Sequence, residues 1–471
     1  MRIIDKIYID GQFVTPRGGE TADLHNPTTG QVIGKVTLGD VEDTRTAIAA
    51  AKRAFKTFSR TTKAERIALL RTLHDAVAAG LYDMKAAMIL EYGAPAMQAG
   101  LMTAMAPEAF LEAAEVLEDY AFERRINKAE VVMEPLGVVG VITPWNANIS
   151  FICGKLSMAI AAGCTSVIKP SEMSAIQTQV LLERLHQAGL PPGVFNVVNG
   201  RGDVVGAEIS AHPDIAKISF TGSTAVGKAI LRAGAETLKR VTLELGGKSP
   251  TVILDDADFA KALPIALMSG FGNSGQACIA GTRILVPQSR LEEFSALAKA
   301  AVEQVKVGDP NDPWTAIGPM VSQKQWERVQ RYIRLGQEEG ATLLAGGEGK
   351  PQGFEDGYFV KPTLFAGVTN GMTIAREEIF GPVLSIIAYG DEEEAIAIAN
   401  DTDYGLQAYV LSEDAARARR VASQLEAGRV SINGGQHEPL APFGGFKQSG
   451  IGRERGVFGL EAHLEPKVLL N

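Results

Sequence analysis

The residues most able to do covalent chemistry lie at 271–282, where Cys278 stands among glycines and alanines. Glycines let a backbone approach a ligand closely, so a thiol in this setting is uncrowded. A thiolate reacts best in a polar, partly open environment, whereas most free cysteines are buried and inert. The stretch therefore predicts a nucleophile or a packed thiol, and the rest of the chain decides between them.

Two polar residues could complete a site around such a thiol. Asn146 directly follows a predicted strand, where its side-chain amide could donate to a developing oxyanion or only form a turn. Glu244 ends an apolar strand, where desolvation would raise its pKa and make it a usable base. Backbone donors satisfying the Glu244 carboxylate are the structural alternative.

Two loops between a strand and a helix suit a nucleotide. The run from Lys169 to Glu172 fits a ribose or phosphate at a helix N-terminus, and a helix cap at Ser171 explains it equally well. The loop at 220–228 could hold a pyrophosphate on its backbone amides. It nearly matches a Walker loop, but Ala229 stands where Ser or Thr would hold magnesium. We therefore exclude ATP hydrolysis.

The elements that must position these residues alternate between strand and helix. A hairpin around Asp10-Gly11 is expected first, and from residue 130 onward strands and helices alternate through two cycles. Such alternation predicts βαβ units and two α/β domains, with ligands at the carboxyl ends of parallel strands. The domains should meet at Gly246-Gly247-Lys248, read as a flexible joint. Three helices are expected before the first cycle, at 41–58, 64–92 and 107–125.

The composition narrows the function classes. A chain of 471 residues with 46% apolar and 21% charged residues predicts a globular protein of two or three domains. A net charge of −9 disfavours nucleic acid and anionic membranes as partners. Only three cysteines and no CxxC pair indicate a reducing compartment. With no signal-peptide core and no membrane-length apolar run, a cytoplasmic location is expected.

Metal and serine-hydrolase chemistry find little support. The six histidines are scattered without HExxH or Cys/His ligand spacing, so no metal is expected. No GxSxG elbow is present for a Ser-His-Asp hydrolase. The apolar tail at 464–470 is expected to pair with another edge strand, within the chain or across a subunit interface.

Taken together, these stretches resemble the aldehyde dehydrogenase superfamily over nearly the whole chain. The shared motifs, in the family's order and approximate spacing, are Pro144-Trp145-Asn146, Lys169-Pro170-Ser171-Glu172, Phe220-Thr221-Gly222-Ser223, Glu244-Leu245-Gly246-Gly247-Lys248, Gly275-Gln276-Ala277-Cys278, Glu377-Glu378-Ile379-Phe380-Gly381-Pro382 and Pro442-Phe443-Gly444-Gly445. Each motif alone is weak, but their combination in this order is specific.

The resemblance implies an α/β fold with two Rossmann-like doubly wound parallel-sheet domains and a small β oligomerisation element. The NAD(P)-binding domain would comprise residues 1–120 and 138–246, and the catalytic domain residues 247–435. The oligomerisation element would comprise residues 121–137 and 458–471, giving a homodimer or homotetramer.

The resemblance also implies catalytic roles. Cys278 would attack the aldehyde carbonyl, while its own N–H and the Asn146 side chain hold the oxyanion. Hydride would pass to the nicotinamide and leave a thioester on Cys278, and Glu244 would activate water to release the acid. Lys155 would support the proton network. Val457 stands where some members place a second relay glutamate, so no role is assigned there.

For the cofactor, the resemblance places Lys169 and Glu172 on the adenosine ribose, Gly222 and Ser223 along the pyrophosphate, and Glu378 on the nicotinamide ribose. Further cofactor contacts are expected from Thr143, Pro144, Trp145, Ser171, Gly202, Phe220, Gly227, Leu245 and Phe380. NAD is favoured because the Glu172 carboxylate would repel a 2′-phosphate, and Lys169 leaves NADP open.

The substrate tunnel departs from the family's pattern. The residues expected to line it are Ala147, Phe151, Gly154, Gly272, Ala277 and Ile279. Small residues stand where a bulky aromatic (147), a tryptophan (154) or an aromatic (272) is often found, Asn148 replaces a proline, and Phe151 only partly compensates. We hypothesise a roomy tunnel for a bulky aldehyde, aromatic or branched. Loop shifts that refill the space are the alternative.

Two rival functions remain. In a CoA-acylating semialdehyde dehydrogenase, CoA rather than water takes the acyl group, and Glu244 argues for water. A catalytically idle member would act only as a structural or binding protein, and the presence of Cys278, Glu244 and Asn146 argues against it.

Overall fold

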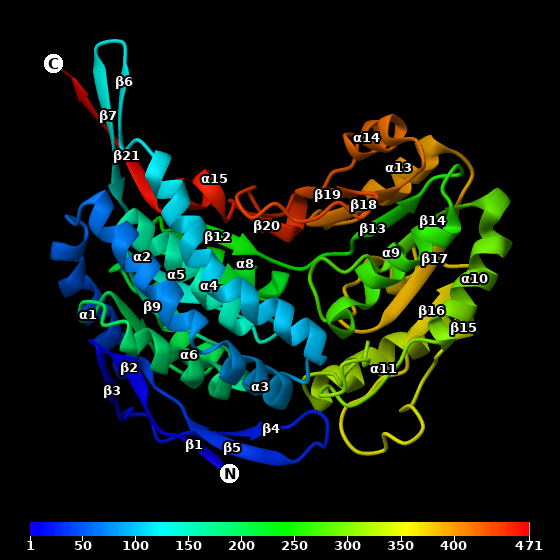
Figure 1. The fold of residues 1–471 in the computed structure, drawn as a ribbon, viewed down its shortest axis with the longest axis horizontal. Coiled ribbons are helices and arrows are strands. Elements are labelled where there is room, and N and C mark those ends of the chain that lie inside the picture. The colour runs from blue at the N-terminus through cyan, green and yellow to red at the C-terminus, as the bar shows by residue number, and fades with distance from the viewer. Residues whose placement is uncertain (471) are drawn as a thin grey trace.

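The computed structural model describes residues 1–470 and has two lobes, each built on one large sheet (Figure 1). The first sheet has eight strands in the order β20-β12-β11-β8-β9-β10-β2-β3. Their bounds are Gly450–Ile451 (β20), Arg240–Glu244 (β12), Ile215–Thr221 (β11), Val138–Ile142 (β8), Thr165–Lys169 (β9), Phe195–Val197 (β10), Ile7–Ile9 (β2) and Gln12–Val14 (β3). Neighbours from β12 to β10 pair in parallel, as the βαβ pattern predicts.

Helices cover both faces of this sheet. Alternate residues of β8 belong to different hydrophobic clusters, because successive side chains on a strand point to opposite faces. Val139 and Val141 pack in the cluster that contains Ile152 of α5 (Asn148–Ala162), whereas Val138 packs in the cluster that contains Ile48 of α1 (Val41–Phe58). The lobe is therefore a three-layer structure.

The second sheet has seven strands in the order β15-β16-β17-β14-β13-β18-β19 and is parallel except at β15. The bounds are Thr342–Ala345 (β15), Thr363–Ala366 (β16), Val383–Tyr389 (β17), Arg283–Pro287 (β14), Pro250–Ile253 (β13), Gln407–Leu411 (β18) and Arg429–Ile432 (β19). Helices α9 (Phe259–Phe271) and α10 (Leu291–Glu303) share one cluster with it, and α11 (Gln323–Glu338) shares another.

Shorter helices complete the two lobes. They are α6 (Ala175–Gln187), α7 (Ala207–Ala211) and α8 (Thr224–Ala235) in the first lobe, and α12 (Thr373–Arg376), α13 (Glu392–Asn400) and α14 (Ala415–Ala422) in the second. Helix α15 (Gly456–Glu461) returns to the first lobe, where it packs against α4 (Ala96–Asp119) and α5.

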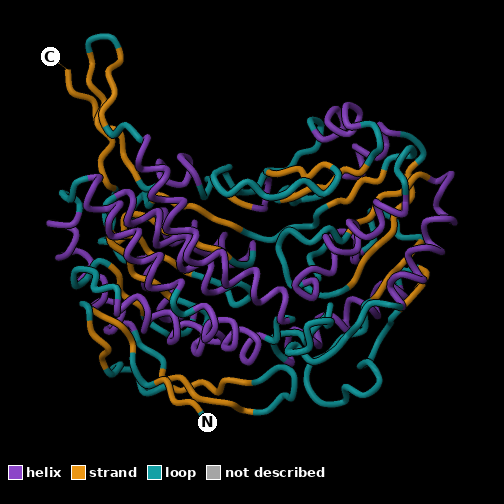
Figure 2. The backbone as a smooth tube through the Cα atoms, in the orientation of Figure 1, coloured by secondary structure: helices purple, strands orange, loops and turns teal. Residues whose placement is uncertain are grey.

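Two three-stranded sheets lie outside the lobes. Strands β6 (Glu123–Ile126), β7 (Ala129–Pro135) and β21 (Leu464–Leu470) form a projecting arm that carries the C-terminal tail (Figure 2). The tail pairs antiparallel with β7 along its whole length, so its partner lies within the chain. The other small sheet joins β1 (Arg2–Ile4), β5 (Val32–Thr37) and β4 (Thr21–His25).

The N-terminal helices differ from the prediction. The predicted helix at 64–92 is two helices, α2 (Lys63–Ala78) and α3 (Leu81–Tyr92), and the third helix, α4 (Ala96–Asp119), begins before residue 107. Pro107 lies inside α4, where proline is usually costly. Burial of Ala99, Met102 and Phe110 on this helix explains why packing prevails. No helix within residues 1–470 is long and apolar enough to cross a membrane.

The link between β12 and β13 is a tight crossing rather than the predicted flexible joint. Gly246, Gly247 and Lys248 are all buried. A Cβ on Gly246 would lie 2.6 Å from Glu378 Oε2, and one on Gly247 would lie 2.3 Å from the Cys278 carbonyl oxygen. The glycines are needed because other parts of the site approach the backbone here.

A buried guanidinium fixes the end of this link. Arg283 is fully buried on β14, and its Nε donates to the Lys248 carbonyl at 3.0 Å. Its terminal nitrogens donate to the carbonyls of Ile398 and Ala399, both at 2.8 Å, near the end of α13. One side chain thus ties the link to the second sheet and to a helix end.

Replacing Arg283 by methionine should leave these carbonyls without donors and cost about 3 kcal/mol of folding stability. We expect the melting temperature to fall by about 5 °C. The control is Arg334→Met, which removes an exposed arginine paired with Glu348. Equal melting temperatures for the two variants would contradict this account of Arg283.

Candidate active site

The loop that carries Cys278 leaves α9 through a strained turn. Asn273 and Ser274 adopt φ angles of 55° and 57°, and Gly275 follows at 71°. Non-glycine residues rarely occupy this left-handed region, and such strain is concentrated at functional sites. Cys278 itself is half-buried, whereas Cys153 and Cys164 are fully buried. Cys278 is therefore the most exposed of the three cysteines.

Hydrogen bonds from both lobes hold this loop. The Gln276 side chain donates to the Pro319 carbonyl at 3.3 Å and accepts from the Val321 N–H at 3.0 Å. The Gln276 carbonyl accepts from the Asn146 Nδ2 at 3.0 Å. The predicted oxyanion donor, from the first lobe, thus lies against the loop of the predicted nucleophile, from the second lobe.

Glu244 lies at the carboxyl end of β12 with its side chain buried. Neither carboxylate oxygen has a hydrogen-bond partner among residues 1–470. Burial and the nearby charge of Glu454 raise its pKa well above the ordinary value, while Lys155 opposes the shift. This agrees with the prediction of a desolvated base, since a buried carboxyl group without donors favours the protonated form.

A polar network lies beside Glu244. Lys155 on α5 forms an ion pair with Glu454 and donates to Ser219 Oγ at 3.1 Å, and Ser219 donates to Glu454 at 3.2 Å. The second carboxylate of this network is therefore Glu454. Val457, where the sequence comparison sought it, is half exposed on α15.

The predicted cofactor residues occupy the carboxyl ends of β9, β11 and β12. Lys169 is buried and its Nζ pairs with Glu172 at 3.0 Å. Ser223 caps α8 by accepting from the Val226 N–H at 3.4 Å, which leaves the helix N-terminus facing the strand ends. The Thr221 hydroxyl is buried without a partner in the described chain.

Glu378 and Phe380 come from the segment before β17. Glu378 accepts from the Gly247 N–H at 3.1 Å, and burial raises its pKa to about 7. Phe380 has a left-handed φ of 63° and meets Trp145 edge-on with a centroid distance of 5.5 Å. Both residues therefore lie against motifs of the first lobe.

The other predicted cofactor residues shape the same region. Gly222 packs over the Phe220 ring, where a Cβ would lie 2.4 Å from a ring carbon. A Cβ on Gly227 would lie 2.7 Å from Leu245, whereas one on Gly202 would meet no atom within 4 Å. Ser171 caps a short 3-10 turn at 172–174. The Thr143 hydroxyl donates to the Asn148 side chain at 3.1 Å.

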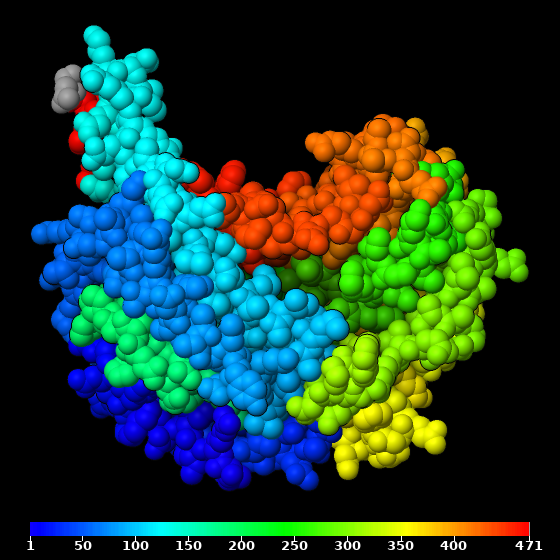
Figure 3. All heavy atoms as spheres, viewed as in Figure 1, coloured from blue at the N-terminus to red at the C-terminus, as the bar shows by residue number. Residues whose placement is uncertain are grey.

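Open space borders the predicted tunnel residues. A Cβ built on Gly154 or Gly272 would meet no atom within 4 Å. Ala147 precedes α5, which carries Phe151, while Ala277 and Ile279 flank Cys278. The space-filling view shows a hollow between α4, the orange-red segment near residues 430–455 and the green segment near residue 270 (Figure 3).

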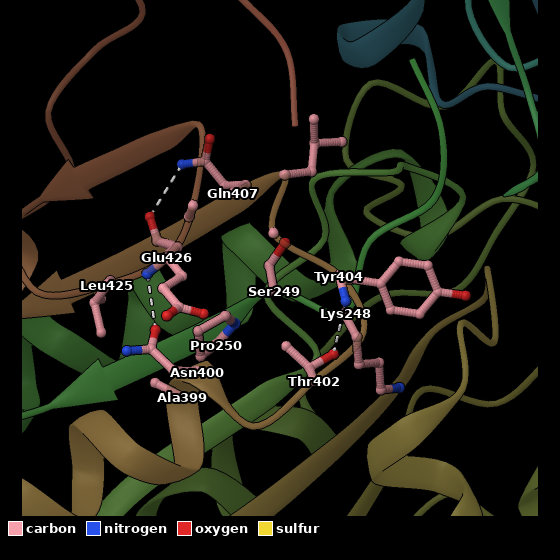
Figure 4. A pocket seen from close by; sticks show the side chains of 14 residues that line it. Lys248, Ser249, Pro250, Ala399, Asn400, Thr402, Tyr404, Gln407, Leu425 and Glu426 are labelled. Carbon is pink, nitrogen blue, oxygen red and sulfur yellow. Dashed lines mark hydrogen bonds between the residues drawn. The ribbon is translucent and has the colours of Figure 1, made fainter. Parts of the chain in front are cut away.

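Another cavity lies behind the glycine link and carries none of the predicted catalytic residues. Lys248, Asn400 and Glu426 are among the residues that line it (Figure 4). Its volume is about 10 Å³, the room of one water molecule. It is too small for an organic substrate. Within residues 1–470, no cluster of three or more His, Cys, Asp or Glu side chains could hold a metal.

Without bound ligands, burial and neighbouring carboxylates keep the Cys278 thiol protonated at neutral pH. Burial and the carboxylates of Glu378 and Glu244 raise its pKa to about 12, against a weaker opposing effect of Arg429. Arg429 was not identified from the sequence, because nothing in its local motif distinguishes it from an exposed strand residue. Glu454 was also missed, because its role depends on Lys155 and Ser219, which the fold brings to it from other elements.

The comparisons with known proteins are consistent in both sequence and structure. The sequence profile described as "Aldehyde dehydrogenase family" matches residues 13–469. A 3-succinoylsemialdehyde-pyridine dehydrogenase from Pseudomonas sp is 48% identical over 473 aligned positions, covering 100% of this chain and 99% of that protein.

Two crystal structures show the same arrangement. An aldehyde dehydrogenase C mutant from Pseudomonas syringae, with NAD+ and octanal, is 45% identical with a TM-score of 0.98 and covers 99% of this chain and 96% of that one. Betaine aldehyde dehydrogenase from Staphylococcus aureus, with NAD+, is 36% identical with a TM-score of 0.96 and covers 99% and 94%. The predicted fold class is confirmed.

The raised thiol pKa predicts how Cys278 reacts without ligands. A pKa of about 12 leaves little thiolate at neutral pH, so alkylation by iodoacetamide should accelerate about tenfold for each pH unit from 7 to 10. Mass spectrometry of the modified peptides should find Cys278 labelled while Cys153 and Cys164 stay unmodified. A rate that levels off near pH 8 would contradict the predicted pKa.

Proposed function

Because the chain belongs to the aldehyde dehydrogenase family, we propose that it oxidises an aldehyde to the carboxylic acid with NAD+ through a thioester on Cys278. The observation that carries the proposal is the meeting of the half-buried Cys278, the Asn146 amide and the buried, unpartnered Glu244 between the two lobes. Related proteins that contain NAD+ support the choice of cofactor.

In the first half of the reaction, Cys278 Sγ attacks the aldehyde carbon and its thiol proton leaves to a nearby base. Water is suited to take it, because burial favours the protonated form of Glu244 before the thioester forms. The Asn146 Nδ2 and the Cys278 N–H would then stabilise the oxyanion. At rest, Asn146 Nδ2 donates to the Gln276 carbonyl, which holds it in this position.

The residues present fit a bound NAD+. Lys169 and Glu172 would hold the adenosine ribose, the α8 N-terminus with Gly222 and Ser223 the pyrophosphate, and Glu378 the nicotinamide ribose. When bound, the nicotinamide supplies the hydride acceptor. The Glu172 carboxylate favours NAD over NADP because it repels a 2′-phosphate.

In the second half, the thioester carbon on Cys278 is attacked by water. Glu244 would take a proton from that water as the carbon–sulfur bond breaks and the acid leaves. Lys155, Ser219 and Glu454 connect to this step, since the ion pair of Lys155 with Glu454 sets the charge felt by Glu244. We propose Glu454 as the second carboxylate that carries this proton away.

The two lobes support separate sites for cofactor binding and for the catalytic thiol. We propose that residues 1–120 and 138–246 bind NAD and that residues 247–435 carry the catalytic thiol. The arm would be the oligomerisation element at 121–137 and 458–471, whose final residue lies outside the described chain. Exposed Val468 and Leu470 on β21 support pairing with a second copy, as a homodimer or homotetramer. A cytoplasmic location remains the expectation from composition.

The substrate tunnel supports a bulky aldehyde. The space beside Gly154 and Gly272 could admit a ring, and the Pseudomonas relative's name describes a semialdehyde joined to pyridine. The octanal in the Pseudomonas syringae structure is a long aliphatic aldehyde. The names of the relatives therefore include both a ring-bearing aldehyde and a long unbranched one.

CoA as the acyl acceptor is the second candidate. Glu244 favours water, since water needs a base to attack the thioester, whereas a CoA thiol would take the acyl group by thiol exchange and release Cys278 as the free thiol. A protein that only binds ligands is disfavoured by the convergence of thiol, amide and carboxylate.

Replacing Glu244 by glutamine should stall hydrolysis after the thioester forms. We expect a burst of about one NADH per active site, followed by steady turnover about 10²–10⁴-fold slower than that of the wild type. Stopped-flow absorbance of NADH, with and without CoA, measures both phases. Wild-type turnover that requires CoA and yields an acyl-CoA would contradict hydrolysis, and Cys278→Ser should abolish the burst.

The open space beside Gly154 and Gly272 predicts that kcat/KM is higher for benzaldehyde than for acetaldehyde. Gly154→Trp should lower kcat/KM for benzaldehyde about tenfold more than for acetaldehyde, by filling the open space. Gly371→Trp, at an exposed glycine that also has open space and an ordinary φ, is the control. A strong wild-type preference for acetaldehyde would overturn the hypothesis.

A further inference from the structure

A cluster of two arginines and one histidine lies beside the Cys278 loop without a carboxylate at its centre. Arg429 Nη1 lies 2.9 Å from His437 Nδ1, and Arg455 Nη1 lies 2.7 Å from His437 Nε2. We call these three residues the arginine–histidine cluster. Its nearest acid in the described chain is Glu112, whose Oε2 lies 3.9 Å from Arg455 Nη1, at the limit of an ion pair.

The cluster has too few hydrogen-bond acceptors. Burial and the two guanidinium groups lower the pKa of His437 to about 4, so its ring is neutral at pH 7. A neutral imidazole has one accepting nitrogen and one N–H. It can therefore accept from only one of the two arginines, and the other guanidinium faces an N–H. An additional acceptor between the arginines would relieve this contact.

Arg429 is directed toward the catalytic loop by its place in the sheet. It pairs in register with Gln407 on β18, whose Oε1 accepts from Arg429 Nε at 2.5 Å. Tyr409, two residues beyond Gln407, lies on the same face and donates to the Ile279 carbonyl at 2.9 Å. Arg429 thus lies on the face that packs against the Cys278 loop. Neither arginine forms a close pair with a carboxylate inside the cluster.

Arg455 is held at the cluster by a strained bend. Its φ of 69° is in the left-handed region, which non-glycine residues seldom occupy without a functional reason. The preceding residue, Glu454, forms two backbone hydrogen bonds of 2.8 Å with Phe443. The Phe443 ring also lies under Arg429, with its centroid 5.2 Å from the guanidinium carbon. The two arginines are therefore fixed by one support.

The position of the cluster relates it to substrate entry. The orange-red segment that contains residues 429–455 borders the hollow seen in the space-filling view (Figure 3). Arg429 is also close enough to Cys278 for its charge to influence the thiol. A molecule that reaches Cys278 from this side passes within reach of the cluster.

We propose that the arginine–histidine cluster binds a carboxylate carried by the aldehyde itself, so that the substrate class is an oxo acid whose aldehyde group reaches Cys278. A carboxylate supplies the acceptors that the cluster lacks, and guanidinium groups match its geometry. This inference rests on the proposed aldehyde oxidation. The inference adds a second requirement to the proposed one on substrate size: the end of the substrate away from the aldehyde must carry a negative charge.

The test compares 4-formylbenzoate with benzaldehyde, which share a ring and differ in the carboxylate. We expect the wild-type kcat/KM to be at least about tenfold higher for 4-formylbenzoate, mainly through KM. In Arg429→Met the ratio of the two kcat/KM values should fall about tenfold, and in Arg429→Lys by less, because charge remains but the fork is lost.

Controls separate the possible outcomes. Arg419→Met, at an exposed position on α14, should keep the wild-type ratio. If Arg429→Met has a lowered melting temperature, Arg455→Met provides the second reading and should also lower the ratio. Equal kcat/KM for both aldehydes in the wild type, or a ratio unchanged in both variants, overturns the inference. Faster turnover of pyridine-3-carbaldehyde than of 4-formylbenzoate would also overturn it, in favour of a neutral acceptor.

Failure of the proposed function would look different. It would show as no NADH formation with benzaldehyde, acetaldehyde or 4-formylbenzoate. Activity with the neutral aldehydes and no preference for the acid contradicts the carboxylate site alone.

Discussion

The close contact between the glycine link and the Cys278 loop is the constraint on which the rest of the structure depends. Gly246 and Gly247 leave room for the Glu378 carboxylate and the Cys278 carbonyl, which any larger side chain would displace. Through this contact the base on β12, the thiol of the second lobe and a cofactor residue meet at one point. Arg283 keeps the far end of the link in place. Domain geometry and catalytic geometry are therefore set by the same few backbone atoms.

The fold could be predicted well where the pattern is local and repeated. The alternation of strands and helices after residue 130 led to two parallel sheets, and Asp10-Gly11 forms the expected hairpin turn, with φ angles of 54° and 80°. The prediction failed at Pro107, because long-range packing of α4 outweighs the local cost of proline. It also failed at Gly246–Lys248, where glycine serves close approach and not flexibility.

The candidate site shows the same division. Cys278, Asn146 and Glu244 could be found because each stands in a distinctive motif at the end of an element. Glu454 and the arginine–histidine cluster could not be found in this way, since their role depends on side chains brought together from α4, β19 and two loops. The spacing of residues along the chain does not reveal contacts of this kind between distant segments. The excess of cations over acids in the arginine–histidine cluster becomes visible only in the three-dimensional structure.

Buried charge is distributed unevenly around the thiol. On one side, Glu244, Glu454 and Lys155 form a partly compensated set whose balance raises the pKa of the proposed base. On the other side, Arg455 has one long ion pair with Glu112 at 3.9 Å, and Arg429 has none among residues 1–470. Desolvation makes both sides energetically significant, because charges interact strongly where water is scarce. A substrate with a negative end would enter from the positive side and deliver its carbonyl toward the acidic one.

The bend at Glu454 and Arg455 links these two sides through one peptide bond. Glu454 pairs with Lys155, which is proposed to serve release of the acid, and its neighbour Arg455 lies against His437. A substitution at this bend that changed substrate selectivity would therefore also disturb turnover. New specificities in descendants of this chain should therefore arise elsewhere, beside Gly154 and Gly272, where open space remains and no shared backbone couples substrate selectivity to turnover rate.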